Sequence, residues 1–326
     1  MSEKFLRIKD LYVEYITKKD ILGTEQKIHA VNGVNLEINQ GEILAVAGES
    51  GCGKSTLAKA VMKLVDVRTG EILLKGKNIL SVQSSKESKD FYKNVQMIFQ
   101  NPYASLNPKM KILQILSEPL EINTNLKKNQ IISIVEDKIK KAGLDNTCLN
   151  LYPHEFSGGQ RQRIAIARAL ILDPEFIIAD EPVSALDVSI QAQIINLLKQ
   201  LKKDFNLTIL FISHDLSVIR YLADRVAVMY LGEIVEKGLT EEIFSAPKHP
   251  YTKALLSSVP ELKPADAKKK IKLTGELPTP ENLPAGCKFH TRCPYVMDIC
   301  KTDIPDEYEF SAAHNCKCFL YQPAVV

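Results

Sequence analysis

Apolar residues follow two different periods along the chain, and each period predicts one kind of element. In residues 5–45, short runs such as LRIKDLYVEY and VNGVNLEI alternate apolar and polar residues, which predicts strands with one covered face. Uninterrupted apolar runs of strand length follow later, and these predict buried strands. They are EILAVAG, FIIADEP and LTILFISHD.

Helical spacing occurs between the buried strands. The stretches KSTLAKAVMKLV and QAQIINLLKQLKKDF repeat apolar residues every three or four positions. Residues 109–143 are also predicted to be helical, because QIISIVEDKIKKAG places four apolar residues on one face: Ile131, Ile134, Val135 and Ile139. Buried strands that alternate with amphipathic helices predict an α/β fold, with a parallel sheet covered by helices on both faces.

The character of the chain changes after about residue 240, where prolines become frequent. The segment KPADAKKKIK is typical of an exposed linker, and its KKKIK run is typical of solvated surface. Five of the seven cysteines then fall within the last forty residues. We therefore predict two domains, residues 1–240 and residues 241–326.

The amino-acid composition mainly excludes certain classes of partner and cellular location. The apolar fraction of 45%, the charged fraction of 25% and the net charge of +3 are those of an ordinary globular protein, and none indicates a nucleic-acid partner. No apolar run approaches the roughly 18 residues that a membrane span needs, and MSEKFLRIKD lacks the apolar stretch of a secretory signal. The sequence thus predicts a cytosolic chain, in which a cysteine cluster indicates metal or redox chemistry rather than disulfides.

Residues 48–56, GESGCGKST, match the phosphate-loop pattern G-x-x-x-x-G-K-[ST] between a predicted strand and a predicted helix. Glycines let such a loop wrap closely, so that its backbone N–H groups point at phosphate oxygens. Lys54 would reach the β- and γ-phosphates, and the Ser55 hydroxyl would bind Mg²⁺. Cys52 lies near the helix N-terminus, where a thiol can be acidified, although tolerance for a small residue is the simpler explanation. The predicted nucleotide-binding residues here are Gly48, Glu49, Ser50, Gly51, Cys52, Gly53, Lys54, Ser55 and Thr56.

Two carboxylates end the buried run FIIADEP. Asp180 suits the Mg²⁺ shell and Glu181 suits polarising an attacking water, whereas a purely structural role would be to cap the strand. The phosphate loop upstream favours the catalytic role. Before this run, FSGGQRQRIAIARAL contains a Ser/Gly turn that leads into a basic helix, which can hold an anion.

These motifs together resemble the ATP-binding subunits of ABC transporters, and the resemblance covers residues 1–240. It is carried, in order, by GESGCGKST, Gln100, FSGGQ, FIIADE, SALD (184–187) and His214. Phe156 stands where the family's signature usually has Leu, which leaves the phosphate-facing residues intact. The resemblance implies a nucleotide-binding domain with a RecA-like parallel sheet core, an N-terminal antiparallel β part and a helical signature subdomain at about residues 101–163. A small Cys-rich C-terminal extension would follow.

Several residue roles are implied by the resemblance alone. Tyr15 would stack on adenine, Gln100 would touch Mg²⁺ and the attacking water, and His214 would hold the γ-phosphate. Asp187 would contact the opposite subunit. The signature residues Ser157, Gly158, Gly159 and Gln160 would bind the γ-phosphate of the nucleotide held by a partner chain. With one phosphate loop and one signature, the working unit would be a dimer.

The C-terminal segment narrows the resemblance to the oligopeptide/dipeptide importer ATPases. EEIFSAPKHPYTKALLSSVP (241–260) and GCKFHTRCP look like the extension of that branch, and FQNPYASLNP (99–108) is similar to its member that pairs with a second, related ATPase. The resemblance implies ATP-driven uptake of peptides and a peripheral location at the cytoplasmic face of the cell (inner) membrane. The implied partners are a second ABC ATPase, as a paralogue rather than a second copy, two transmembrane permease subunits and, indirectly, an extracytoplasmic solute-binding protein.

Other functions stay open at this point. A soluble ABC ATPase that acts on ribosomes or DNA usually carries two cassettes or a long coiled-coil insertion, and this chain has neither. A subunit with a dead site is disfavoured by the intact Lys54, Asp180, Glu181 and His214. An importer ATPase of the same branch that drives uptake of nickel or sugars would carry the same ATP-hydrolysing motifs.

The C-terminal cysteines admit iron–sulfur, zinc or unligated thiols. Structural zinc favours tight C-x₂₋₄-C knuckles; the spacing here is wider, although His290 creates a C-x₂-H-x₂-C run that keeps zinc open. Thiolates from a Pro-containing loop suit a [4Fe–4S] cluster. The bound metal would stabilise the fold of a segment that is too small to fold by burial alone. The resemblance implies the ligands Cys287, Cys293, Cys300 and Cys318, the last lying four residues after His314, with Cys316 as the alternative.

Overall fold

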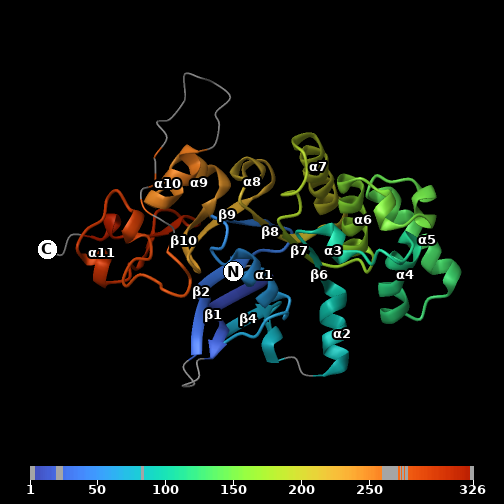
Figure 1. Cartoon of the computed structure of the whole chain (residues 1–326), viewed down its shortest axis with the longest axis horizontal. Coiled ribbons are helices and arrows are strands. Elements are labelled where there is room, and N and C mark those ends of the chain that lie inside the picture. Colours follow the sequence, from blue (N-terminus) through green and yellow to red (C-terminus); the bar gives the residue numbers. More distant parts are fainter. Residues whose placement is uncertain are drawn as a thin grey trace. The chain divides into compact units, whose positions relative to one another are not determined.

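The protein is described by a computed structural model that covers residues 4–19, 25–81, 84–258, 271, 273, 275 and 278–323. The chain divides into two compact units, and Figure 1 labels the helices and strands that belong to them. The first unit comprises Met1–Glu37, Leu44–Lys77 and Ser213–Val326, and the second comprises Ile38–Ile43 and Asn78–Ile212. The predicted division near residue 240 stays a prediction.

The first unit carries an antiparallel sheet with the strand order β2-β1-β4-β5. Leu6 and Ile8 of β1 are buried and so are Leu11 and Val13, so the alternation slips by one residue between these pairs. The register of the β1–β4 pairing shifts at the same place, and one extra residue in β1 explains the slip. The strands are β1 (Leu6–Lys19), β2 (Glu25–Ile38), β4 (Thr69–Leu74) and β5 (Lys77–Asn78).

Other strands of this unit are ordered β11-β12-β10-β9-β3. β3 and β9 pair in parallel, and the remaining neighbours pair antiparallel, so the C-terminal extension adds strands beside β10. These strands are β3 (Ile43–Ala47), β9 (Arg225–Tyr230), β10 (Glu233–Leu239), β11 (Glu307–Glu309) and β12 (Asn315–Lys317). The helices of the unit are α1 (Lys54–Val61), α8 (Leu216–Leu222), α9 (Thr240–Ser245), α10 (Pro250–Ser257) and α11 (Ile299–Thr302).

The second unit combines parallel strands with most of the long helices. β6, β7 and β8 pair in parallel, and every residue of β7 and β8 is buried, as expected for strands without a solvated face. The strands are β6 (Val95–Ile98), β7 (Phe176–Asp180) and β8 (Thr208–Ser213). The helices are α2 (Ser85–Asn94), α3 (Pro102–Ser105), α4 (Ile112–Asn123), α5 (Lys128–Lys141), α6 (Gly158–Leu170) and α7 (Val188–Phe205). Short 3-10 turns span Ile79–Ser81, Asn146–Asn150, Pro153–Glu155, His290–Arg292 and Phe319–Tyr321.

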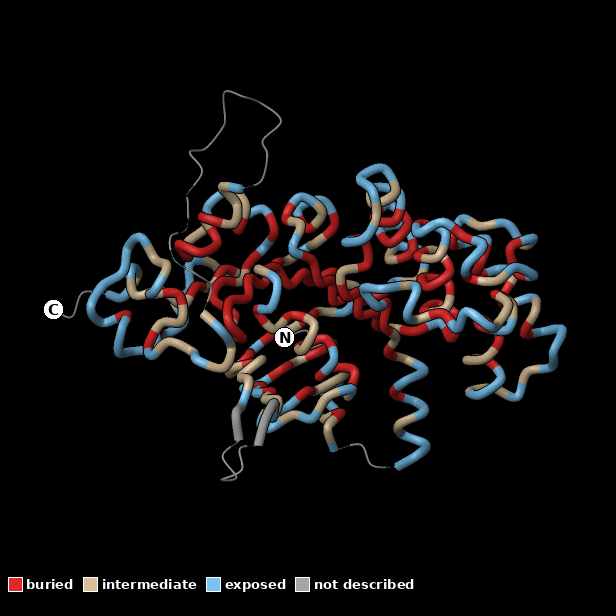
Figure 2. Tube along the Cα trace, viewed as in Figure 1, coloured by how far each residue is buried: buried red, intermediate tan, exposed pale blue. Residues whose placement is uncertain are grey.

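The predicted helices in residues 109–143 are confirmed as α4 and α5, which share one apolar core with α6. Ile131, Val135 and Ile139 are buried there and Ile134 is partly buried, so the face predicted for α5 is the buried one (Figure 2). The predicted linker KPADAKKKIK lies almost wholly outside the described residues. Among the described residues, no helix is both long and apolar enough to span a membrane.

Candidate functional site

The phosphate loop joins β3 to α1 and is built around Lys54, the first residue of that helix. The Lys54 side chain is buried, and its Nζ donates hydrogen bonds of 2.8 Å to the carbonyl oxygens of Gly48 and Glu49. Gly53 has a φ of 106°, and a Cβ there would lie 2.2 Å from the Ala30 carbonyl oxygen. Only glycine fits this position. The loop therefore closes on its own lysine and packs tightly against the preceding sheet.

Cys52 is not acidified by the helix N-terminus. Its thiol is almost fully buried, and burial raises the pKa of Cys52 despite the nearby Lys54 ammonium. The free position of the motif thus holds a small, buried thiol with a raised pKa, which agrees with the simpler of the two sequence interpretations.

Tyr15 lies beside the end of the phosphate loop. It is half-buried on β1, and its hydroxyl donates a 3.4 Å hydrogen bond to Oγ1 of Thr56. The neighbouring Glu14 accepts from the Nδ1 of His29 at 2.9 Å and from the Arg68 guanidinium, which fixes this part of the strand. An aromatic ring thus lies next to the predicted phosphate site, and its stacking on adenine stays a prediction.

The second unit brings together the side chains that end β6 and β7. Asp180 is buried at the end of β7, and Glu181 follows it. The Nε2 of Gln100, two residues after β6, donates a 3.0 Å hydrogen bond to the Glu181 carboxylate. The parallel pairing of β6 and β7 explains this contact, because neighbouring parallel strands end at the same edge. The Glu181 backbone has a φ of 46°, an uncommon value for a residue with a side chain, and its N–H donates to the Ile212 carbonyl oxygen.

The signature residues begin α6. Ser157 caps the helix: its Oγ accepts from the Gln160 N–H, and the Gln160 side chain accepts from the Ser157 N–H at 3.0 Å. Ser157, Gly158 and Gln160 are exposed, whereas Gly159 is buried, with the place of its missing Cβ 2.4 Å from Ile190. The helix N-terminus therefore faces solvent at Ser157, Gly158 and Gln160, while buried Gly159 packs on α7, and an exposed helix N-terminus suits the binding of an anion.

Asp187 lies next to this segment and caps α7. Its carboxylate accepts hydrogen bonds from the Ser189 hydroxyl at 2.6 Å and from the Ile190 N–H at 3.0 Å, and these bonds lower the pKa of Asp187. The side chain is exposed and ionised. Because Gly159 packs on Ile190, the signature and Asp187 are held as one surface of the second unit.

His214 directly follows β8 and is exposed. It belongs to the first unit, with the phosphate loop, whereas Gln100, Asp180, Glu181 and the signature belong to the second. The structure brings Tyr15 to Thr56 in the first unit and Gln100 to Glu181 in the second. The roles of the remaining motif residues, including His214, stay predictions.

The C-terminal cysteines are free thiols, as are Cys52 and Cys148. Burial raises the pKa of Cys287 to about 12 and that of Cys318 to about 11, and neighbouring thiols contribute to both shifts. Cys300 and Cys316 are buried; Cys316 lies on β12 opposite Glu236, and its pKa is raised by burial, by Glu236 and by Cys318 and Cys287. Across the described residues, no three His, Cys, Asp or Glu side chains are arranged to hold one metal ion. The predicted metal cluster at Cys287, Cys293, Cys300 and Cys318 is therefore not seen.

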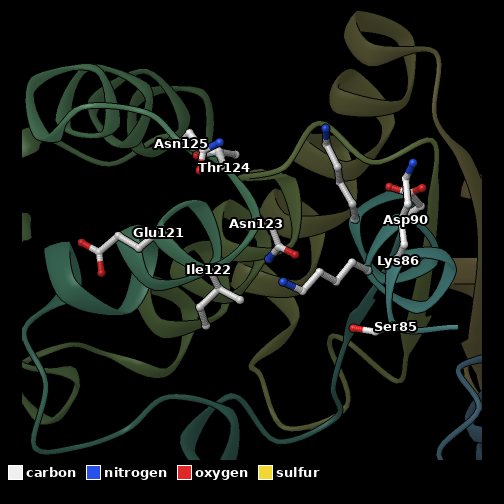
Figure 3. Close-up of a pocket in the computed structure, with 10 residues that line it drawn as sticks. Ser85, Lys86, Asp90, Glu121, Ile122, Asn123, Thr124 and Asn125 are labelled. Carbon is white, nitrogen blue, oxygen red and sulfur yellow. The ribbon is translucent and has the colours of Figure 1, made fainter.

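A cavity opens between α2 and the C-terminal end of α4, where Lys86 extends toward Asn123 (Figure 3). None of its lining residues belongs to a predicted motif, so this cavity is not the predicted nucleotide site. It is lined by Ser85, Lys86, Lys89, Asp90, Lys93, Glu121, Ile122, Asn123, Thr124 and Asn125.

Two residues of the extension contact the phosphate loop without any signal in the sequence. The Arg292 guanidinium pairs with the Glu49 carboxylate, and the Tyr251 hydroxyl accepts from the Glu49 N–H. They lie 243 and 202 positions from Glu49. No local spacing rule joins residues so far apart.

Comparison with known proteins places these features in a family. Residues 31–184 match the ABC transporter family, and residues 235–300 match the C-terminal region of oligopeptide/dipeptide transporters. The oligopeptide transport ATP-binding protein AppF of Bacillus subtilis is 51% identical over 90% of this chain and 90% of its own length. The dipeptide transport ATP-binding protein DppF of Escherichia coli is 49% identical over 90% of this chain and 87% of its own length.

A solved structure supports the same relationship. The dimeric bacterial ABC transporter cassette MJ0796 is 28% identical and matches with a TM-score of 0.64, covering 72% of this chain and 98% of its own. The resemblance seen in the motifs and the predicted fold class are thereby confirmed. The chain belongs to the ABC transporter family of ATP-binding proteins, in its oligopeptide/dipeptide branch, and is an ABC-type ATPase.

Proposed function

We propose that this chain hydrolyses ATP to drive the uptake of short peptides, most directly oligopeptides or dipeptides. The observation that carries the catalytic part is the Glu181 carboxylate beside buried Asp180, oriented by a 3.0 Å hydrogen bond from Gln100. The transport part rests on the relatives, which are oligopeptide and dipeptide transport ATP-binding proteins.

In this proposal the phosphates of ATP lie against the N–H groups of residues 48–56. The Lys54 ammonium exchanges its hydrogen bonds to the carbonyl oxygens of Gly48 and Glu49 for contacts with the β- and γ-phosphates. Tyr15 stacks on the adenine, and His214 holds the γ-phosphate. Ser55, Gln100 and Asp180 hold Mg²⁺, an ion that neutralises phosphate charge.

Glu181 is the general base of the proposed reaction. It accepts a proton from the water whose oxygen forms a bond to the γ-phosphorus, while the bond from that phosphorus to the β-phosphate oxygen breaks. The products are ADP and inorganic phosphate. Gln100 holds the Glu181 carboxylate in place before the water arrives.

We also propose that the site is completed by a second chain. The exposed residues Ser157, Gly158 and Gln160 would contact the γ-phosphate of a nucleotide bound to the partner's phosphate loop, with Gly159 holding the turn and Asp187 against the partner. A second, paralogous ATPase is the proposed partner. Two transmembrane permease subunits and an extracytoplasmic solute-binding protein complete the transporter, and this chain is peripheral at the cytoplasmic face of the inner membrane.

Replacing Glu181 by Gln tests the catalytic role. We expect turnover to fall by about 10²–10⁴-fold, while ATP binding is retained because the phosphate loop is unchanged. The matched control is Glu121→Gln, which alters an exposed carboxylate of α4 in the same unit. Near-normal hydrolysis by Glu181→Gln would contradict the assignment.

Co-purification tests the transport function. The full chain, tagged and isolated from its native membranes, should bring down multi-span membrane proteins and a second ATPase. Uptake of labelled di- and oligopeptides should stop with Glu181→Gln. Recovery with ribosomes alone would favour a soluble ABC ATPase, and uptake of nickel or sugars instead of peptides would reassign the solute.

For the extension we propose a [4Fe–4S] cluster held by Cys287, Cys293, Cys300 and Cys318. The support is electrostatic: the pKa of Cys287 is raised partly by Cys300, Cys318 and Cys293, so these thiols are near neighbours. Cys316 is also near Cys318 and Cys287, which keeps it as the alternative ligand, but the Glu236 carboxylate beside it opposes a thiolate there more strongly than either thiol does. Buried thiols that must otherwise stay protonated are stabilised as thiolates by a metal.

Anaerobic purification tests this assignment. The chain should be brown and contain about four irons, and Cys300→Ser should lose them while Cys316→Ser keeps them. Colourless protein with stoichiometric zinc would give the site to zinc, and metal-free protein with an ordered extension would overturn both.

A further inference from the structure

The phosphate loop is tied to the C-terminal extension through a single residue, Glu49. The two terminal nitrogens of the Arg292 guanidinium donate to the two carboxylate oxygens of Glu49 at 2.8 and 3.2 Å. The Tyr251 hydroxyl accepts the Glu49 N–H at 2.9 Å. The extension therefore makes hydrogen bonds to both the side chain and the backbone of Glu49.

Tyr251 and Arg292, which bind Glu49, are themselves fixed by the packing around them. Tyr251 is fully buried, and its ring packs against Tyr230 and Phe289 with centroid distances of 4.6 and 5.5 Å. Phe289 is also buried and stands three residues before Arg292, so it fixes the segment that carries the guanidinium. The Arg292 side chain is only 10% exposed. Packed aromatic supports of this kind restrict the motion of the polar groups that they carry.

Glu49 in turn shapes the centre of the loop. Its carbonyl oxygen accepts hydrogen bonds from the Lys54 Nζ at 2.8 Å and from the Cys52 N–H. A shift of the Glu49 backbone would therefore displace the lysine and the loop amide at once. A continuous chain of contacts runs from the extension, through Glu49, to Lys54.

The charge of Glu49 supplies a second physical reason. A carboxylate in a phosphate loop repels a bound triphosphate, and like charges at short range cost more in a partly buried place than in water. The bidentate Arg292 pair neutralises that carboxylate. Without Arg292, the loop would keep a negative charge where an anion has to bind.

We propose that Arg292 and Tyr251 are positioning residues of the nucleotide site, and that the C-terminal extension thereby sets the affinity of this chain for ATP. The inference rests on the proposed ATP site at residues 48–56. Neither residue touches the nucleotide; both act through Glu49. Their loss raises the dissociation constant for ATP and leaves turnover at saturating ATP nearly unchanged.

The test measures binding of MgATP to the full chain by calorimetry, with turnover measured in parallel. Arg292→Gln should raise the dissociation constant about tenfold, because a hydrogen-bonded charge is left unpaired. Tyr251→Phe removes only the hydroxyl and should raise it by a smaller factor. The matched controls are Tyr321→Phe, whose hydroxyl bonds the Lys248 carbonyl oxygen instead, and Arg7→Gln, which removes an arginine–glutamate pair away from the loop.

A double substitution separates positioning from simple stabilisation. Glu49→Gln combined with Arg292→Gln removes both charges, so affinity should recover toward that of the natural protein. If Arg292 only stabilises the fold of the extension, the double variant will bind no better than Arg292→Gln, and this result overturns the inference. Thermal melting without ATP reports the folding of each variant. If Arg292→Gln does not fold, two other variants decide instead. Arg292→Lys keeps the positive charge but loses the bidentate pair with Glu49, and Tyr251→Phe loses the hydroxyl. Wild-type affinity for ATP in both variants overturns the inference.

The proposed function can fail separately. If the Lys54→Ala variant binds ATP as tightly as the wild-type protein, the proposed nucleotide site is wrong, and the inference falls with it. Wild-type protein that binds ATP through Lys54, combined with unchanged affinity in Arg292→Gln and Tyr251→Phe, would overturn the inference alone.

Discussion

The phosphate loop and the signature segment differ in how much of their own chain surrounds them. Lys54 is buried, and the loop is held by residues from distant parts of the sequence, including Tyr251 and Arg292. Ser157 is exposed, and the signature is held by a capping box that spans only residues 157–160. One half of the predicted ATP site is thus held by contacts from distant parts of the chain, although Ser50 and Gly51 are exposed, and the other half is held by its own four residues at the surface.

This difference follows from what each segment has to do. A loop that wraps phosphates needs backbone conformations that short-range contacts do not stabilise, such as the φ of 106° at Gly53, so it depends on packing from elsewhere. A helix N-terminus needs only its cap to stay in place. An exposed, locally stable signature is what a surface for a second chain requires.

Lys54→Ala gives the largest expected contrast between the two regions. In the isolated chain it should weaken ATP binding by about 100-fold, because a charge-assisted phosphate contact is lost. Ser157→Ala should leave ATP binding by the isolated chain unchanged. Equilibrium binding measures both, with Lys59→Ala on the exposed side of α1 as the control. Equal losses from Lys54→Ala and Ser157→Ala would show that the signature acts within its own chain.

Mixed dimers sharpen the same contrast. A Lys54 substitution in one chain and a signature substitution in its partner fall on the same composite site, so the other site keeps its turnover. When both substitutions are in one chain, each falls on a different site and both sites are damaged. ATPase assays on dimers assembled from differently tagged chains compare the two arrangements. Identical residual turnover would count against composite sites.

Gly53→Ala should destabilise the protein more than Gly51→Ala, by about 2–3 kcal/mol of unfolding free energy. Both glycines have positive φ, but a Cβ at Gly53 meets the Ala30 carbonyl oxygen at 2.2 Å, whereas a Cβ at Gly51 meets nothing within 4 Å. Denaturant unfolding of the two variants measures the difference. Equal destabilisation would mean that the loop is not packed against the sheet.

Acid should loosen the support of the phosphate loop. His249 caps α10, its Nδ1 accepts the Tyr251 N–H, and burial lowers the pKa of His249 from 6.5 to about 4, with Lys253 also opposing and Glu236 favouring the charged ring. Because the folded pKa is depressed, this stability is complete above pH 6.5 and is lost as pH falls toward 4. Between pH 7 and 5 the loss is about 2 kcal/mol. His249→Asn, which still caps the helix, should flatten the pH dependence of unfolding, and an unchanged slope would rule out His249 as its cause.

The sequence was sufficient wherever structure depends on local spacing. The strand–loop–helix around GESGCGKST, the apolar face of α5 and the carboxylates at the end of β7 were all predicted, because each is determined by residues within one or two elements. The contact between Gln100 and Glu181 agrees with motif order and parallel pairing.

Contacts between distant parts of the sequence were not predictable. The residues around Glu49 in the sequence do not predict its contacts with Arg292 and Tyr251. Likewise, the residues around Glu236 do not predict its 2.7 Å contact with His314. The burial that raises the pKa of Cys52 comes from the folded surroundings of the loop rather than from its helix. Such features depend on tertiary packing, which a pattern of residue types does not encode locally.

The contact between Arg292 and Glu49 also imposes an order on biosynthesis. Glu49 leaves the ribosome 243 residues before Arg292 is made, an interval of about 12–50 s at typical bacterial elongation rates. Once His214 has been made, the nascent chain carries every predicted nucleotide-binding motif, but the carboxylate in its phosphate loop has no Arg292 counter-charge. If Arg292 positions the loop as proposed, a polypeptide that stops before Arg292 binds ATP poorly, and only a chain translated through Arg292 acquires a finished nucleotide site.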